Sequence, residues 1–435
     1  MAGASVLMLA NPALAQDAID AAGAQKEYQY VFNTLLFLMG GFLVMWMAAG
    51  FAMLEAGMVR TKNVAMQCTK NIALYSVAGL MFWIIGYNIA YPGDGNWLID
   101  QYFGNPSPVS MPEPGKDTAN AYSTGSDWFF QMVFCATAAS IVSGTVAERI
   151  KLWPFLIFVA ALTGVIYPTV ASWEWGTGWL DDMGFSDFAG STLVHSTGGW
   201  AALVGAIIIG ARRGKYGPNG EVNAMPGSNM ALATLGTFIL WLGWFGFNGA
   251  SQLAMGTIAD ASSVSKIFVN TNLAAAGGVL VAIILNQVFY GKVDLTMALN
   301  GALAGLVAIT AEPLTPAIWQ AVVIGGIGGA IVVFTVPLLD KMRIDDVVGA
   351  IPVHLFAGIW GTLIVAWTNT DASLITQAIG VAATGVFVTA ASLVVFLILG
   401  AVGLRPTEED EFEGLDKAEI GLEAYPEFGS GSQRI

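Results

Sequence analysis

The sequence predicts an all-α polytopic membrane protein with eleven transmembrane helices, ten of them arranged as a five-plus-five inverted repeat. Three observations predict it: the composition, the number of long apolar windows, and an internal repeat that contains both histidines. Of the 435 residues, 55% are hydrophobic and only 11% are charged, whereas a soluble domain carries about 25% charged residues. The same composition excludes an intrinsically disordered chain, because there is ample apolar surface to bury.

Apolar windows of about 20 residues are long enough to cross the hydrocarbon core of a bilayer as helices. The windows follow one another closely, so residues 16–404 are expected to form one transmembrane domain without a separate soluble domain. Eleven windows occur, at residues 31–58, 72–91, 126–147, 152–172, 188–211, 228–252, 263–288, 294–312, 317–339, 347–368 and 374–403.

Residues 1–15 have the features of a secretory signal peptide. They contain a short apolar core and an Ala-Leu-Ala ending at Ala15. We expect cleavage near Gln16, which places the mature N-terminus outside the cytoplasmic membrane. Because no Lys or Arg precedes the apolar core, two alternatives stay open: the natural start lies upstream, or the segment is a remnant.

The basic residues between the windows predict the orientation. The even-numbered loops and the N-terminal segment carry only Lys26, Lys116 and Lys266. Since Lys and Arg concentrate in cytoplasmic loops, the odd loops and the C-terminal tail are predicted to be cytoplasmic, in a multi-pass protein of the cytoplasmic (inner) membrane. The odd-numbered loops carry eleven basic residues, namely Arg60, Lys62, Lys70, Arg149, Lys151, Arg212, Arg213, Lys215, Lys292, Lys341 and Arg343.

The remaining charges exclude several classes of protein. The formal net charge is −14, and residues 405–435 alone carry nine acidic and three basic residues. No basic stripe is available to bind phosphates, so nucleic acid is not an expected partner. The two cysteines, Cys68 and Cys135, both lie in or beside apolar runs and predict neither a disulfide framework nor a cysteine metal site.

Both histidines lie in an internal repeat. The pattern G-x-x-x-V-H-x-x-x-G begins at Gly190 and includes His195, and it recurs from Gly349 with His354. The repeats occupy the fifth and the tenth windows. Five windows per half is an odd number, so the second half must cross the membrane upside down relative to the first. Inverted repeats place the functional site near the midplane, where the two halves meet.

Three uses can account for these histidines. A single histidine on an apolar helix is usually a structural hydrogen-bonding group, but two at equivalent positions favour a functional pair. A metal site is disfavoured, because two histidines without nearby cysteines or a carboxylate pair are a poor ligand set. Imidazole exchanges a proton near neutral pH, which favours a pore for protons or for a small polar solute.

Aromatic residues cluster at the predicted outer ends of several windows. Phe130 and Phe134 share one helix face, as do Phe247 and Ser251, and Trp175 ends the fourth window. Each alone is more typical of core packing or of an interfacial belt. Together, the rings and one hydroxyl are suited to hold a small cation.

Four segments carry a specific pattern: Asp187 to His195 with Ala211 and Arg212, Phe130-Gln131 through Ala147-Glu148-Arg149-Ile150, Gly246 to Ser251, and Asp345-Asp346 through Val353-His354. They resemble the ammonium transporter (Amt/Mep/Rh) family, and within it a bacterial-type Amt. The similarity covers residues from about 30 to 425 and implies an eleven-helix protomer, a homotrimer and one pore in each subunit.

The resemblance implies roles for individual residues. The pore gate would be Phe134 with Phe247, and the twin histidines of the pore would be His195 and His354. Asp187 would shape the outer site and orient backbone groups, and Thr310 would be a polar pore residue. The outer substrate-binding site would comprise Phe130, Phe134, Trp175 and Ser251.

The function implied is transport of ammonium or ammonia, with methylammonium as an analogue, in nitrogen uptake. The outer site would recruit ammonium, the cation would lose a proton, and ammonia would pass the histidines. No cofactor is expected. Two alternatives stay open, an ammonium sensor that signals through its tail and an Rh-like channel for ammonia or carbon dioxide. An enzyme is disfavoured, since no nucleophile, metal constellation or phosphate-binding loop is recognisable.

Residues 405–435 resemble the family's cytoplasmic regulatory tail. One interpretation is a solvated acidic segment, and the other is a tail that docks on the cytoplasmic loops of a neighbouring subunit. The resemblance also makes a PII-type nitrogen signalling protein a candidate partner at this face. The basic residues predicted as a counter-surface for the tail are Arg149, Lys151, Arg212 and Lys341.

Overall fold

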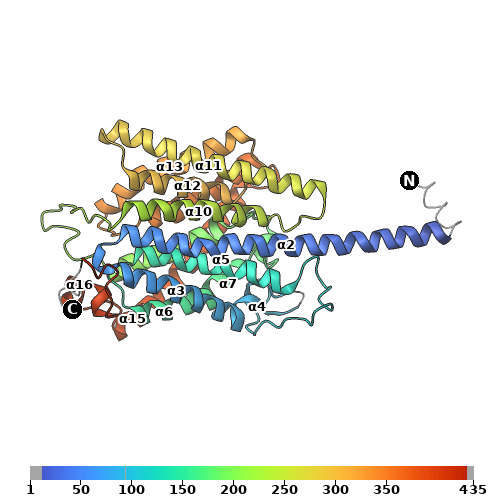
Figure 1. Ribbon diagram of the computed structural model, residues 1–435, viewed down its shortest axis with the longest axis horizontal. Helices are drawn as coiled ribbons and strands as arrows, with labels where there is room; N and C mark the ends of the chain where they lie inside the picture. The colour runs from blue at the N-terminus through green and yellow to red at the C-terminus, as the bar shows by residue number, and fades with distance from the viewer. Residues whose placement is uncertain (1–11, 94, 429–435) are drawn as a thin grey trace.

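The computed structural model describes residues 12–93 and 95–428, and nearly all of this part of the chain is helical. The long helices lie side by side in one bundle (Figure 1). Ten helical segments are long and apolar enough to cross a membrane, and Leu295–Thr310 is a shorter apolar helix. These eleven segments coincide with the eleven predicted windows, so the predicted fold class is confirmed.

Each half of the bundle contributes five crossings, and one helix follows the second half. The first five crossings are α2 (Pro12–Met58), α3 with η2 and α4 (Val64–Met81, Phe82–Gly86, Tyr87–Ala90), α5 (Thr124–Thr145), α6 with η3 and α7 (Leu152–Ala161, Leu162–Ile166, Tyr167–Ser172), and η4 with α9 (Ser191–Ser196, Thr197–Ile209). The others are α10 (Met230–Ala250), α11 (Ile258–Tyr290), α12 (Leu295–Thr310), α13 (Ile318–Lys341), η5 with α14 (Ile351–Phe356, Ala357–Thr368), and α15 (Leu374–Val402).

Short elements lie in the connections between crossings. A small antiparallel hairpin pairs Trp97 with Gly104. The short elements are η1 (Thr61–Asn63), β1 (Trp97–Ile99), β2 (Phe103–Gly104), α8 (Trp179–Asp182), α16 (Glu408–Glu413) and α17 (Leu415–Ala418).

Helix α2 extends past the ends of the other helices, and α16 lies at the opposite end of the bundle (Figure 1). An odd number of crossings requires the two ends of the chain to lie on opposite sides. The predicted signal peptide, residues 1–15, lies mostly outside the described residues, and its last four residues begin α2.

Small residues bring α2 and α10 into close contact along their length. A Cβ atom added to Gly57 would lie 2.5 Å from the backbone nitrogen of Ala233, and one added to Gly243 would collide with Met47. Membrane helices pack closely where such residues let the backbones approach, because lipid supplies no hydrophobic force between helices. The two halves of the molecule therefore meet tightly at this helix pair.

The repeat has the same local structure in both halves. Gly190 has φ 104° and Gly349 has φ 79°, a left-handed region that favours glycine. Each glycine precedes a π-helical turn that contains the histidine, η4 in the first half and η5 in the second. An aspartate lies three residues before each glycine, Asp187 in the first half and Asp346 in the second.

The two aspartates satisfy backbone groups at the start of these turns, where a helix leaves its N–H groups unpaired. Asp187 accepts hydrogen bonds from the N–H groups of four successive residues, 190 to 193, at 2.7–3.0 Å. Asp346 accepts from the N–H of Ile351 at 2.7 Å and from the hydroxyl of Thr145 at 3.0 Å. The second aspartate also ties η5 to α5.

A buried ionic network joins the loops at the end of the bundle where α16 lies. Arg212 bonds to Asp345 at 2.9 Å and to Glu148 at 2.9 Å, and Glu148 also pairs with Arg60. Burial alone would raise the pKa of Asp345, but hydrogen bonds from Arg212 and the charge of Arg149 hold that pKa well below its usual range. The carboxylate of Asp345 is therefore a fixed negative charge among the loops.

The tail packs on its own subunit in this structure. The carboxylate of Asp416 accepts from the N–H groups of Ala65 and Met66, at 3.1 and 2.7 Å, near the start of α3. The N–H of Leu415 donates to the side chain of Asn63 at 3.0 Å. Leu415 is buried, so apolar packing accompanies these polar contacts.

Two of the four basic residues predicted as counter-surface are unavailable to the tail, whereas Lys151 interacts electrostatically with Asp410. Glu411 pairs with Arg405 at 2.7 Å and with Arg213 at 3.4 Å, and Lys62 donates to the carbonyl of Glu411 at 2.9 Å. Arg149 and Arg212, which we predicted as counter-surface, are fully buried among carbonyls and carboxylates of the loops. Carbonyl and carboxylate groups of the loops already pair with these two arginines, so the tail cannot bind them. This is the physical reason for the error.

Asp345→Asn is expected to destabilise the folded protein by about 3–5 kcal/mol, because it leaves the buried charge of Arg212 without its main partner. The loss would be seen in thermal unfolding of purified protein in detergent at neutral pH. The stabilisation by Asp345 should be complete above the unfolded-state pKa of about 3.9 and should vanish as the pH falls through the lower folded-state pKa.

Asp340→Asn is the matched control for this measurement. Asp340 pairs with Lys215 at 3.1 Å, but its side chain is 28% exposed, and pairs of that kind are worth about 0–1 kcal/mol. Equal losses of stability in the two variants would show that the buried network stabilises the protein no more than the partly exposed pair does.

Candidate functional site

The four residues predicted for the outer site line one cavity. It has a volume of about 170 Å³. The structure therefore brings together side chains from α5, from α10 and from the loop after α7. The lining residues are Tyr91, Tyr122, Asp127, Phe130, Gln131, Phe134, Trp175, Phe188, Ser251 and Leu253.

The aromatic rings in this cavity hold one another in place. Phe130 and Phe134 meet edge to face at 4.7 Å between ring centroids, and Phe134 and Trp175 meet in the same way at 6.1 Å. The indole N–H of Trp175 donates to the carbonyl of Asp187 at 3.0 Å, and the hydroxyl of Ser251 donates to the carbonyl of Phe247 at 2.8 Å. The Ser251 oxygen keeps its lone pairs for a donor, and aromatic faces attract a small cation.

Asp127 supplies a carboxylate to this cavity, and the sequence reasoning missed it. It is 7% exposed and accepts from the hydroxyl of Tyr87 at 2.6 Å and from Gln131 at 3.3 Å. Its spacing was a usable signal, because Phe130 and Phe134 follow it by three and seven residues on the same helix face. A carboxylate here favours the binding of a cation over a neutral solute.

Two phenylalanine rings close the inner end of the cavity. Phe134 and Phe247 stack with 3.9 Å between their centroids and 22° between their planes. Both are buried, at 1% and 0% exposure. Because a packed interior has no room for a solute between stacked rings, a solute can pass here only when the rings move apart. This placement fits the predicted gate.

The two histidines meet directly behind the gate. Nδ1 of His195 lies 3.1 Å from Nδ1 of His354, so one ring donates a hydrogen bond to the other. The His195 ring is stacked 5.3 Å from Phe247, and its Nε2 has no hydrogen-bond partner among the described residues. One imidazole nitrogen therefore stays available to a polar solute that has passed the rings.

Thr310 does not line any of the cavities described here. Its hydroxyl accepts from the indole N–H of Trp244 at 2.8 Å and donates to the carbonyl of Leu306 at 2.7 Å. Trp244 in turn stacks on His195 at 5.0 Å. Thr310 thus supports the pore through Trp244. The sequence reasoning missed Trp244, although it precedes Phe247 by three and Ser251 by seven residues on one face of α10.

Asp187 lies behind the outer site, beside a second buried carboxyl group. The N–H of Asp187 donates to Glu174 at 2.7 Å, and burial together with the charge of Asp187 raises the pKa of Glu174 well above its ordinary value. Asp187 contacts backbone groups and is fully buried. Its place agrees with the predicted role in orienting backbone at the start of η4.

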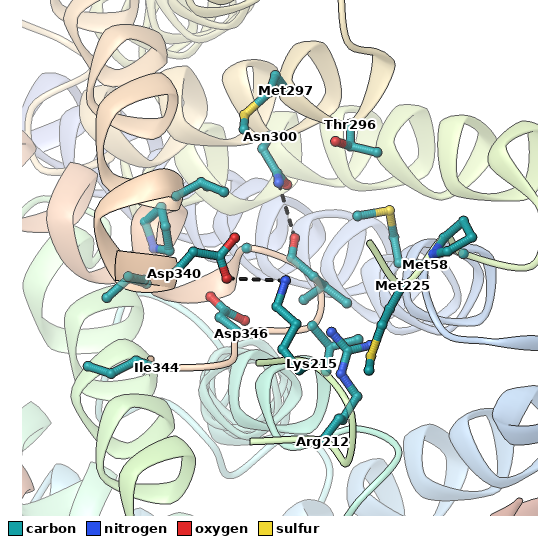
Figure 2. Close-up of a pocket in the computed structure, with 18 of the residues that line it drawn as sticks. Met58, Arg212, Lys215, Met225, Thr296, Met297, Asn300, Asp340, Ile344 and Asp346 are labelled. Atoms are coloured by element: carbon teal, nitrogen blue, oxygen red, sulfur yellow. Dashed lines mark hydrogen bonds and ion pairs between the residues drawn. The ribbon is translucent and has the colours of Figure 1, made fainter. Parts of the chain in front are cut away.

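The series of neighbouring cavities continues on the other side of the histidines. A cavity of about 10 Å³ is lined by His354, Phe51, Asn300 and other residues. A vestibule of about 320 Å³ follows and shares Asn300 and Val348 with the smaller cavity. Figure 2 shows the vestibule, with Asn300 donating to the Val348 carbonyl at 3.1 Å and Lys215 paired with Asp340 at 3.1 Å. Outer cavity, gate, histidines, small cavity and vestibule thus form one series of neighbours.

Comparison with known proteins identifies the family. The model of the Ammonium Transporter Family matches residues 35–425. Ammonium transporter Amt2 of Archaeoglobus fulgidus is 41% identical over 422 residues, which cover 90% of this chain and 87% of that protein. Ammonium transporter Amt1 of Haloferax mediterranei is 37% identical and covers 91% and 80%.

A solved structure agrees with the sequence relatives. The structure titled Sensor Amt Protein superposes with a TM-score of 0.83 at 34% identity, covering 90% of this chain and 99% of that one. Members of this family are transporters and not enzymes. With a family model that covers most of its length and relatives at about 40% identity, the chain belongs to the ammonium transporter family.

Proposed function

We propose that the protein moves ammonium across the cytoplasmic membrane through a pore in each subunit. The cation enters the outer aromatic cavity, loses a proton, and continues as ammonia past the twin histidines. The observation that carries the proposal is the series of cavities on both sides of the gate, with His195 and His354 at its centre. Transport is favoured over a sensor role because the family model and the sequence relatives Amt2 and Amt1 bear the transporter name, although one similar structure is titled a sensor.

The outer cavity is suited to select a cation before it is deprotonated. Asp127 adds negative charge, the rings of Phe134 and Trp175 present their faces, and Ser251 offers a hydrogen-bond acceptor. Size alone does not separate ammonium from potassium. The hydrogen-bonding acceptors favour ammonium, because potassium has no N–H to donate.

The centre of the pore is suited to ammonia and opposes an intact ion. The His195 ring lies between Trp244 and Phe247, at 5.0 and 5.3 Å. A bare charge in such apolar surroundings costs many kcal/mol, whereas a neutral molecule that is hydrogen-bonded to Nε2 costs little. Releasing the proton before the gate avoids moving the charge through its walls. The hydrogen-bonded imidazoles offer that proton a separate route.

The proposal includes an orientation and an assembly. The N-terminal side, after removal of residues 1–15 near Gln16, lies outside, and the vestibule and the tail lie in the cytoplasm. The excess of Lys and Arg in the loops at the tail's end of the bundle supports this orientation. The subunits form a homotrimer, and a PII-type signalling protein is the candidate partner at the vestibule face. Nitrogen uptake is the physiological role that this arrangement serves.

His195→Ala and His354→Ala are each expected to lower the selective ammonium current by about a hundredfold or more, or to convert it into an ion leak, because a positioned proton-transfer group contributes that much. The measurement is current from purified protein in proteoliposomes, with ammonium compared against potassium. Wild-type selectivity and rate in both variants would return the histidines to a purely structural role.

Trp175→Leu combined with Ser251→Ala should raise the half-saturating ammonium concentration by about 2- to 30-fold, the equivalent of a cation–π contact of about 0.5–2 kcal/mol. Uptake of labelled methylammonium over a concentration series measures this. Trp153→Leu is the control, since that ring is 72% exposed and lies outside the cavity. An unchanged concentration dependence in the double variant would make the cluster an interfacial belt.

Truncation after Pro406 is expected to leave a folded trimer with reduced or unregulated transport. This cut keeps Arg405, which donates to the carbonyls of Ile209 and Ala211 at 2.9 and 2.8 Å, so the loops stay anchored. Asp416→Ala should reproduce the effect, because it removes the contact with α3, whereas the exposed Glu427→Ala should not. Uptake is compared at matched membrane abundance, and equal rates in all forms would make the tail a solubilising segment.

A further inference from the structure

A buried carboxylate lies on the inner side of the histidine pair, apart from the predicted outer site and gate. Glu55 of α2 is 1% exposed and lines the same small cavity as His354 and Asn300. An ionisable residue inside a membrane span is costly, and by default it marks a functional site. Its hydrogen bonds decide whether a structural role accounts for it.

The two carboxylate oxygens of Glu55 differ in their hydrogen bonds. Oε2 accepts three hydrogen bonds, from Asn71 at 2.7 Å, from the hydroxyl of Ser143 at 2.9 Å, and from Gln67. Oε1 has no hydrogen-bond partner among the described residues. The carboxylate is thus held firmly by one oxygen, and the other keeps all its lone pairs for something that enters the cavity.

Space beside the free oxygen is kept open by a glycine. A Cβ atom added to Gly144 would lie 3.4 Å from Oε1 of Glu55 and 2.5 Å from a methyl carbon of Val348. Val348 also lines the vestibule. Any larger residue would fill the gap between Oε1 and this wall, so Gly144 leaves Oε1 open on the side that leads inward.

A lysine lies close to Glu55 without occupying Oε1. Lys70 is 1% exposed, and its Nζ donates to the carbonyl of Ser143 at 2.9 Å and to Gln67 at 3.2 Å. Gln67 and Ser143 therefore connect the two side chains. When Lys70 carries its proton, its charge lowers the cost of an ionised Glu55 without a direct ion pair.

We propose that Glu55 is the proton acceptor on the inner side of the histidine pair, an assignment that rests on the proposed function. The proton that ammonium releases in the outer cavity passes to the histidines, and the molecule continues as ammonia. The proton leaves His354 and binds Oε1 of Glu55, which becomes a carboxylic acid. Ammonia that has passed the histidines takes this proton, leaves as ammonium and restores the carboxylate. One ammonium enters and one leaves, so atoms and charge balance.

Glu55→Gln tests the assignment, because the amide oxygen can still accept the three hydrogen bonds made to Oε2 but the group cannot carry a proton. Full-length protein in proteoliposomes is given an inward ammonium gradient. Electrical current reports the movement of charge, and a pH dye in the lumen reports ammonia that arrives without its proton, since such ammonia makes the lumen alkaline.

In Glu55→Gln the proton can only return from the histidines to the outer side. The current should therefore fall by about a hundredfold, the lower range for a positioned proton-transfer group, while ammonia still arrives and makes the lumen alkaline. Glu55→Asp, which restores a carboxylate, should regain part of the current. Ser140→Ala, in the same cavity, loses the hydrogen bond from its hydroxyl to the carbonyl of Ala136, worth about 1 kcal/mol, and should keep its current to within about fivefold.

The two readouts separate this assignment from its alternatives. Wild-type current in Glu55→Gln overturns it and leaves the proposed function intact. A proportional loss of current and of ammonia flux, unrelieved in Glu55→Asp, also overturns it, because it shows that Glu55 only supports the fold. Absence of any ammonium-dependent current or flux in the wild-type protein would instead contradict the proposed function.

Discussion

The hydrogen bond between His195 and His354 is the interaction on which the arrangement of the pore depends. Each histidine belongs to one half of the chain, so the contact forms only where the two inverted halves meet. Both rings are delivered by a π-helical turn that follows a glycine in the left-handed region. The turns begin on carboxylates, Asp187 and Asp346, that accept the unpaired N–H groups. The spacing of eight residues from aspartate to histidine is therefore a structural unit that occurs twice.

From this centre the pore is polar at both ends and lined by rings beside the histidines. Asp127 lies in the outer cavity and Glu55 in the inner one, each mostly buried. Between them, Phe134 and Phe247 stack and exclude solutes until they move. Charge can be stabilised on either side of the histidines, but an ion between the rings would lose its solvation without compensation. In the proposed function, this distribution favours separate routes for the proton and for ammonia over the shortest part of the path.

Much of this could be predicted from the sequence, and the failures have a common cause. Hydropathy locates the eleven crossings because their length is set by the bilayer, and the repeat identifies both histidines because the halves share a pattern. Trp244 and Glu55 were missed. Each lies within an apolar helix, and the period of a helix shows which residues share a face but not which other helix that face meets. Their importance follows from contacts with residues far away in the chain.

The contacts of the tail show the same limit of sequence-based prediction, here for charged residues. Counting basic residues predicts an attractive surface, but it does not separate Arg212, which Asp345 and Glu148 neutralise inside the loops, from Arg213, which stays partly exposed and pairs with Glu408 and Glu411. Buried partners are set by three-dimensional packing, and only the charges left over can bind another segment.

A series of contacts through Arg213 and Arg212 also connects the tail to the turn that carries His354. Arg213 adjoins Arg212, Arg212 holds Asp345, and the next residue, Asp346, caps the turn that carries His354. Contiguity alone does not transmit a signal, because coupling requires an element with two arrangements. The Arg213 contacts are the exposed and therefore the weakest part of this series, with 46% of the Arg213 side chain in solvent. If the tail regulates transport, the change in arrangement belongs there, since the Arg212–Asp345 pair behind it is buried and costly to break.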